Sequence, residues 1–220
     1  MDFAGMTQTW ISVLTGPGEE VFEREQASPN ATLSTALIWT ILAAFVVAVL
    51  GFVQSLIFAS SAAGMLGTIS QMDLPPESQA LIEQMMAGGL MTGLSGAGAF
   101  LGIILSPLFF LIGVGIIHLI ANVLGGQGDF GRYAYLSAAI GAPVSILNAF
   151  LGFIPVVGGC VGFLLLIYSL VLNYFAIKVS YSLSSGRAIA VILIPVIVVL
   201  GGVLCIGFAV AAAFAGMGAQ

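Results

Sequence analysis

Residues 100–124 read FLGIILSPLFFLIGVGIIHLIANVL and contain no Asp, Glu, Lys or Arg. A helix needs about 20 predominantly apolar residues to cross the hydrocarbon core of a bilayer, and this stretch is long enough to do so. The apolar run is also continuous, whereas the strands of a membrane barrel alternate between apolar and polar residues. The stretch therefore predicts a transmembrane α-helix.

Three other long stretches also lack these four residue types: 26–72, 133–177 and 188–220. As a single helix, the second of them would reach about twice the thickness of a bilayer core. It is interrupted at Pro155 and at Gly158-Gly159, which indicates a tight hairpin between two helices. We therefore predict an all-α, polytopic transmembrane helix bundle with five spans, at about residues 35–58, 100–124, 133–154, 156–181 and 188–214.

Composition excludes several classes of protein. The 220 residues are 60% hydrophobic and only 6% charged, whereas soluble domains carry about a quarter charged residues. The chain cannot cover a normal solvated surface, so its main partner is the lipid bilayer. The net charge of −5 and the absence of a basic patch exclude nucleic acid as a primary partner.

The few basic residues predict the orientation of the chain. With five spans, all of them fall on one side of the membrane: Arg24, Arg132, Lys178 and Arg187. Cytoplasmic loops collect Lys and Arg, so we expect the N-terminus inside and the C-terminus outside. A count of four or six spans would scatter these residues over both sides.

The chain divides into two expected parts. Residues 1–30 form a cytoplasmic segment at the membrane interface, and residues 31–220 form the membrane domain, with a long outer loop at 59–99. In the first part, Trp10 is expected at the level of the lipid headgroups. Pro17 is expected as the first residue of a short helix. The segment either anchors the first span or docks a cytoplasmic protein.

Polar residues inside the spans are candidates for function. They are His118, Asn122, Asn148 and Asn173. The first hypothesis is that His118, Asn122 and Asn173 face a shared cavity near the inner leaflet that relays protons or binds a solute. The second is that these side chains hydrogen-bond between helices and hold the bundle together. The spans contain no Asp or Glu, no HExxH and no set of zinc ligands, so we expect no catalytic residue, no metal and no cofactor.

The turn after residue 124 formally satisfies GxGxxG, as Gly126-Gln127-Gly128-Asp129-Phe130-Gly131. A dinucleotide site needs a preceding strand and a βαβ unit, and here the motif joins two membrane helices. We interpret it as a tight inner turn in which glycines end one helix and Asp129 caps the next. This turn is the candidate surface for a protein partner, with the following residues: Gly126, Asp129, Phe130, Arg132 and Tyr133.

Small residues recur at a spacing of four in two spans: Gly98, Gly102 and Ser106, and Gly158 with Gly162. Such spacing lets helix backbones approach closely. The same feature serves packing inside one bundle and association into a homo-oligomer, and both remain open.

Short blocks of sequence give a resemblance that extends over most of the chain. The blocks are Trp10 to Leu14 before Pro17, His118 to Ile120 leading into Gly125 to Phe130, Tyr133 to Tyr135 leading to Pro143, and Lys178 with Arg187 flanking Ser184-Ser185-Gly186. They resemble the Yip domain family, the Ypt/Rab-interacting integral membrane proteins, in its prokaryotic form. The resemblance implies five spans, the N-terminus inside, and a multi-pass protein of the prokaryotic cytoplasmic membrane.

The resemblance also implies a role, with one restriction. Eukaryotic relatives are tied to vesicle trafficking and contact prenylated small GTPases, but of their Asp-Leu-Tyr-Gly-Pro signature only Gly16-Pro17 corresponds here. GTPase binding is therefore not carried over. The expected function is that of a non-enzymatic protein that organises membrane or recruits protein partners at the cytoplasmic face. The alternative is a small permease or channel-like protein built around His118.

Overall fold

The computed structural model describes residues 3–70, 96–154 and 156–217, and the described part of the chain is helical without any strand. Residues 71–95 of the expected outer loop lie outside the described residues. The helices are α1 (Phe3–Thr15), α2 (Glu19–Gln26), α3 (Leu33–Ser70), α6 (Gly96–Val123), α7 (Phe130–Leu151), α8 (Val157–Tyr181) and α9 (Ser185–Met217). This confirms the predicted all-α class.

Within the described residues, five helices are long and apolar enough to cross a bilayer. The segments are Leu33–Phe58, Leu101–Val123, Phe130–Leu151, Val157–Tyr181 and Ser185–Phe208, which confirms the number of spans. Helix α3 continues past the predicted end of the first span at residue 58 and reaches Ser70. Its added residues are largely Ala, Ser, Gly, Met and Leu. At 1.5 Å per residue α3 is about 57 Å long. It is therefore longer than the roughly 30 Å needed to cross a bilayer core.

Helix α7 lies at the centre of the bundle and packs against α3, α8, α6, α1 and α2. Half of an apolar 18-residue stretch of α7 is buried inside the protein, whereas only 6% of the corresponding stretch of α9 is buried. Its buried residues include Ala134, Ala138, Ala139 and Ala142. Small side chains let neighbouring helices approach the α7 backbone closely, which explains how one helix can serve so many contacts.

The two glycines at a spacing of four in α8 serve this packing. A Cβ at Gly158 would overlap the carbonyl oxygen of Leu151, and one at Gly162 would lie 3.0 Å from Oδ1 of Asn148. Both neighbours belong to the last turn of α7 or the turn before it. The glycines therefore allow the tight α7–α8 hairpin, whereas an added Cβ at Gly102 of α6 would meet no atom within 4 Å in the described structure.

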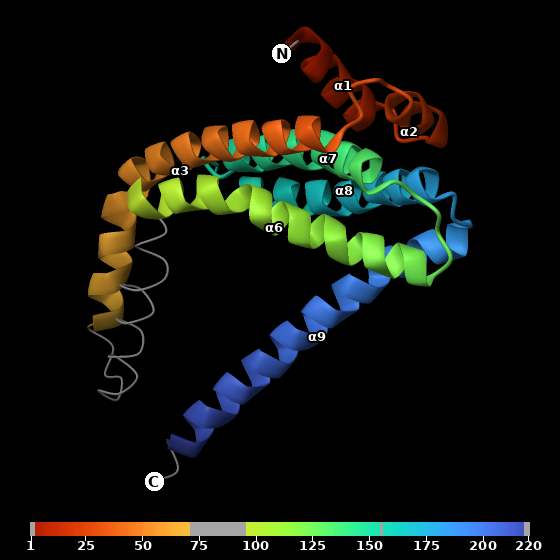
Figure 1. Cartoon of the computed structure of the whole chain (residues 1–220). Helices are drawn as coiled ribbons and strands as arrows, with labels where there is room; N and C mark the ends of the chain where they lie inside the picture. The colour runs from red at the N-terminus through yellow and green to blue at the C-terminus, as the bar shows by residue number, and fades with distance from the viewer. Residues whose placement is uncertain (1–2, 71–95, 155, 218–220) are drawn as a thin grey trace.

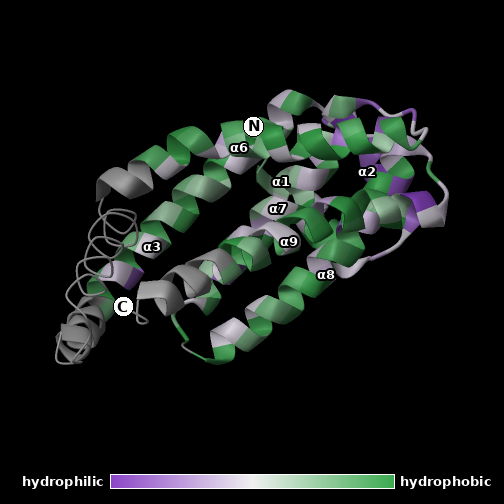
Figure 2. Ribbon diagram, turned by 90° about the horizontal axis from the view of Figure 1, so that it is seen from below, coloured by the Kyte–Doolittle hydropathy of each residue, from purple (hydrophilic) through white to green (hydrophobic). Residues whose placement is uncertain are grey.

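All four basic residues lie at one end of the bundle, which we call the basic end. It is formed by the start of α3, α7 and α9, the end of α6 and α8, and the short helices α1 and α2 packed on α7 and α8 (Figure 1). Hydrophilic residues gather there around α2, while the long helices are mostly hydrophobic (Figure 2). Away from this end, α9 diverges from the other helices (Figure 1).

The N-terminal helices differ from expectation at both residues that the sequence singled out. Trp10 is only 9% exposed and makes a T-shaped contact with Trp39 of α3, with ring centroids 6.0 Å apart. The ring is therefore covered by protein and holds α1 on α3, with little surface left for contact with lipid headgroups. Pro17 is not in a helix, because α2 begins at Glu19 with Gly18 as its N-cap. The proline instead forms part of the turn between α1 and α2.

Candidate functional site

The turn that leaves α6 has a defined backbone geometry. Gly125 has a φ of 86°, its N–H donates to the carbonyl of Asn122 at 2.9 Å, and the N–H of Gly126 donates to the carbonyl of Ala121 at 2.9 Å. These two bonds and the left-handed residue form a Schellman motif, which satisfies carbonyls that the helix end leaves unpaired. Glycine suits the position because it has no Cβ to strain.

The next helix starts with the predicted cap. Oδ1 of Asp129 accepts from the backbone N–H of Arg132 at 2.9 Å, and Asp129 has extended backbone geometry. An aspartate in this position satisfies one of the free N–H groups of the first turn. Both ends of the turn are therefore fixed by local hydrogen bonds.

The same turn also packs tightly on the end of α8. The N–H of Gln127 donates to the carbonyl of Tyr181 at 3.2 Å. A Cβ at Gly128 would lie 2.4 Å from the carbonyl oxygen of Ser180 and 2.4 Å from Cδ1 of Tyr181, which is closer than any real contact. Only glycine fits at this position without a shift of the backbone.

His118 hydrogen-bonds through both ring nitrogens. Nδ1 lies 2.7 Å from the hydroxyl of Tyr181, and Nε2 lies 3.0 Å from Nδ2 of Asn122. The ring also meets Phe130 edge to face, with centroids 5.4 Å apart. With Nδ2 of Asn122 as the donor to Nε2, the tautomer that completes both bonds has its proton on Nδ1 and donates it to Tyr181. This group joins α6, α7 and α8 at the basic end.

The other two predicted polar residues lie elsewhere. Nδ2 of Asn173 donates to the carbonyl of Ser169 in its own helix at 2.7 Å. Asn173 lines a separate cavity of about 280 Å³ among four helices, together with Val114, Ile117, Tyr133, Ser137 and Pro195. Asn148 lies near Gly162, towards the other end of α7. The structure thus brings together His118 and Asn122, but not the whole predicted group.

Tyr181 was not among the residues predicted from the sequence, yet it contacts His118, Tyr133 and the Gly128 backbone. It is 63 positions away from His118 in the chain. A tyrosine at the end of an apolar helix is also a common interfacial residue, so the sequence held no signal that distinguished this role.

The candidate partner surface is smaller than the sequence suggested. Tyr133 is only 2% exposed and packs on Tyr181, so its side chain cannot meet a partner. Phe130 is half-buried against His118. The exposed charged residues of the turn are Asp129 and Arg132.

Arg187 of α9 is also exposed and lies beside the turn, with Nη1 3.2 Å from the position of a Cβ at Gly125. We call Asp129, Arg132 and Arg187 the charged turn surface. Within the described ranges the ion pairs are Arg24–Glu25 and Lys178–Glu19, so none of these three residues is in one.

These features define a class: a polytopic α-helical membrane protein whose charged turns are ordered at one end of the bundle. Residues 11–206 match the family model of the Yip1 domain, and the chain therefore belongs to the Yip1 domain family. This confirms the resemblance drawn from the sequence. Comparison with curated proteins and with solved structures gave no match.

Proposed function

We propose that this Yip1-family protein is a non-enzymatic scaffold of the prokaryotic cytoplasmic membrane that recruits protein partners at its basic end. The observation that supports the proposal is the ordered, exposed charged turn surface. Its backbone is fixed by the Schellman motif at Gly125, the cap at Asp129 and the hydrogen bond from Gln127 to Tyr181. A partner that binds this surface does not have to order the turn, so binding loses less conformational entropy.

The charges of this surface suit a protein partner. It carries both signs, and mixed charges give specificity and orientation in protein association more than raw affinity. Because all four basic residues lie at the same end, the positive-inside rule supports a cytoplasmic position for it. The end with α1 and α2 would then be open to soluble proteins of the cytoplasm.

The hydrogen bonds of His118 also favour a scaffold. A proton relay or a solute site needs polar groups that face water, whereas both nitrogens of this ring are bonded to Tyr181 and Asn122. Such bonds between helices stabilise membrane bundles. The hydrogen bonds of His118 therefore join α6 to α8 next to the turn.

A second candidate, a small permease, is favoured by the cavity lined by Asn173, which lies among α6, α7, α8 and α9. Single cysteines at positions 118 and 173, in a background without Cys160 and Cys205, separate the two candidates. A scaffold predicts that a membrane-impermeant thiol reagent labels neither position. Labelling of both would indicate a water-filled path and favour the permease.

The direct test of partner recruitment is photocrosslinking in cells with a photoreactive amino acid at Gln127, which is exposed in the turn. Leu193 on the exposed face of α9 is the control position. We expect discrete protein adducts at position 127, none at 193, and loss of the adducts in an Arg132→Glu background. Adducts that persist unchanged after this charge reversal would contradict the proposal.

A further inference from the structure

A hollow also lies at the basic end, and it is separate from the charged turn surface and from the cavity at Asn173. It has a volume of about 780 Å³ and lies between α1, α2, the following loop and the start of α3. This volume is within the range of about 300–1,000 Å³ typical of small-molecule sites. The residues that matter most in its wall are Thr9, Ser12, Arg24, Glu25, Trp39 and Tyr135.

The hollow lies near the start of the α3 span, beside apolar residues that are exposed on the helix. Trp39 is six residues after the start of the span at Leu33, which is about 9 Å along the helix. Ile38, also in the wall, is 44% exposed, and Ile41 on the next turn is 43% exposed. A molecule with a polar group in the hollow can therefore lay an apolar chain along this exposed face of α3.

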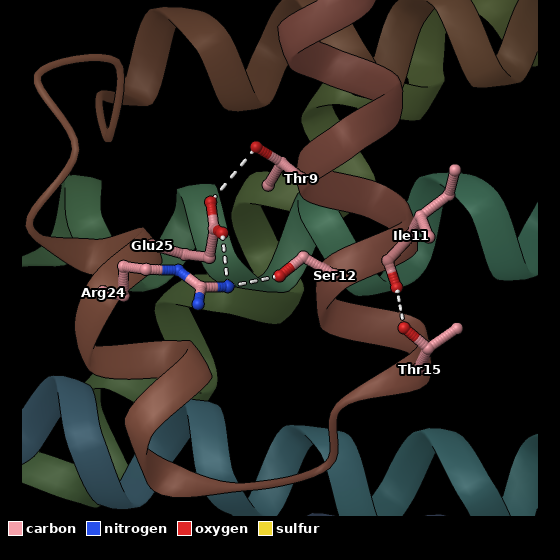
Figure 3. Close-up of polar contacts among 6 residues, drawn as sticks. All are labelled: Thr9, Ile11, Ser12, Thr15, Arg24 and Glu25. Carbon is pink, nitrogen blue, oxygen red and sulfur yellow. Dashed lines mark hydrogen bonds and ion pairs between the residues drawn. The ribbon is translucent and has the colours of Figure 1, made fainter.

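The polar side of the hollow contains a charge of each sign. Figure 3 shows Thr9 and Ser12 of α1 pointing toward Glu25 and Arg24 of α2. Oγ1 of Thr9 donates to Oε2 of Glu25 at 3.1 Å, and Nη2 of Arg24 donates to Oγ of Ser12 at 2.6 Å. Of the described residues that line the hollow, Arg24 and Glu25 are the charged ones, so its net charge is zero.

This ion pair leaves both partners with capacity for a ligand. Nη2 of Arg24 lies 3.4 Å from Oε1 of Glu25, which is longer than the 2.7–2.9 Å usual for a charge-assisted hydrogen bond. A carboxylate offers about four acceptor sites and a guanidinium five donors. The Glu25 side chain is only 13% exposed, whereas that of Arg24 is 65% exposed. An incoming ammonium would find a largely desolvated acceptor, and a phosphate an accessible donor.

From these contacts we infer that the hollow binds the headgroup of phosphatidylethanolamine, with the ammonium at Glu25, the phosphate at Arg24 and an acyl chain along Ile38. A primary ammonium has three N–H donors for the carboxylate. The trimethylammonium of phosphatidylcholine has no such donor, and phosphatidylglycerol has no cation for Glu25. The inference does not depend on partner recruitment at the charged turn surface.

The test measures lipid binding to the full-length protein in detergent by native mass spectrometry, with phosphatidylethanolamine, phosphatidylcholine and phosphatidylglycerol as separate probes. We expect one phosphatidylethanolamine to bind more tightly than either other lipid. Glu25→Gln should weaken its binding about tenfold or more, since it removes a charged hydrogen-bond acceptor. Glu23→Gln is the matched control, because Glu23 is exposed on the same helix and does not line the hollow.

A second variant guards against misfolding of the first. Gln8 is an exposed residue of α1 in the wall of the hollow, and Gln8→Trp should fill the site and abolish selective binding while the melting temperature is unchanged. Water-soluble glycerophosphoethanolamine distinguishes a lipid from a free headgroup, and it should compete only at far higher concentration. Equal binding of the three lipids, binding that Glu25→Gln leaves unchanged, or equal affinity for the chain-free headgroup would each overturn the inference.

Discussion

Helices α7 and α9 both qualify as membrane spans, yet they differ in hydropathy and in burial. The apolar stretch of α7 has a mean hydropathy of 1.6, and half of its residues are buried. The corresponding stretch of α9 has a mean hydropathy of 3.2, and only 6% of it is buried. Lipid is as apolar as a leucine side chain, so hydrophobicity does not drive helices together inside a bilayer. A helix surrounded by protein needs small and shape-matched side chains, and a helix that faces lipid needs apolar ones.

The same difference separates the basic end from the exposed part of α9. At the basic end, the α6–α7 turn contacts α8 through backbone atoms, and Trp10 of α1 contacts Trp39 of α3. Along α9, large side chains such as Leu204 and Phe208 are more than 70% exposed. Substitutions at tightly packed positions of the basic end and of α7 should therefore affect folding, while similar substitutions at exposed positions of α9 should not.

The largest effect is expected from Gly128→Ala. The new Cβ would overlap the carbonyl oxygen of Ser180, and no side-chain rotation can relieve a clash with backbone. We expect destabilisation of about 3 kcal/mol or failure to fold, at the upper end of overpacking effects. Gly202→Ala in α9, where an added Cβ would meet no atom of the described structure within 4 Å, should stabilise slightly. SDS-titrated unfolding of the purified variants checks the pair, and equal effects would contradict the comparison.

A smaller effect is expected from Leu136→Ala in α7, where the side chain is fully buried. The loss is one of packing contacts, because the unfolded helix exposes the same side chain to lipid. We expect a loss of about 2 kcal/mol in the free energy of unfolding, at the low end of core truncations. The matched control is Leu200→Ala, at a residue 57% exposed on α9. A control variant that loses as much stability would place α9 inside a protein interface.

A still smaller effect on stability is expected from Tyr181→Phe, which removes the hydroxyl that pairs with Nδ1 of His118. Hydrogen bonds between membrane helices contribute about 0.6 kcal/mol on average and up to about 1.7 kcal/mol. We expect a loss of about 1 kcal/mol, because the variant also leaves the imidazole N–H unpaired. A double-mutant cycle with Asn122→Ala measures whether the bonds of His118 act together. Full additivity would show that they do not.

The smallest effect on stability is expected for Arg132→Glu at the charged turn surface. Arg132 is exposed, and surface substitutions usually change stability by less than about 0.5 kcal/mol. The melting temperature should therefore stay that of the parent, while crosslinking from position 127 is lost. A large drop in melting temperature would mean that the side chain supports the fold instead of a partner.

Much of the fold was predictable because it depends on local chemistry. Long uncharged runs specify the five spans, and the arrangement of four basic residues agrees with that count. The turn from Gly125 to Asp129 was also predictable, since a glycine after a helix and an aspartate before the next one act through nearby backbone groups. The extension of α3 to Ser70 was not, because residues 59–70 are compatible with either helix or loop.

Contacts between distant segments were not predictable. An aromatic residue before a span can face lipid or protein, and hydropathy is the same in both cases, so the burial of Trp10 had no signature in the sequence. Likewise, the spacing of His118 and Asn122 placed them on one helical face. Nothing indicated that Tyr181 would meet them, or that Asn173 would turn toward a separate cavity.

Tryptophan quenching by brominated lipid tests the contrast between the two regions most directly. The chain has two tryptophans, Trp10 and Trp39, and both are buried against each other. In vesicles of phosphatidylcholine brominated near the headgroup end of its chains, we expect the native protein to resist quenching. Ile189→Trp, at an exposed position near the start of α9, should add a component that is strongly quenched. Strong quenching of the native protein would contradict this account, because it would mean that the two tryptophan rings contact lipid and not each other.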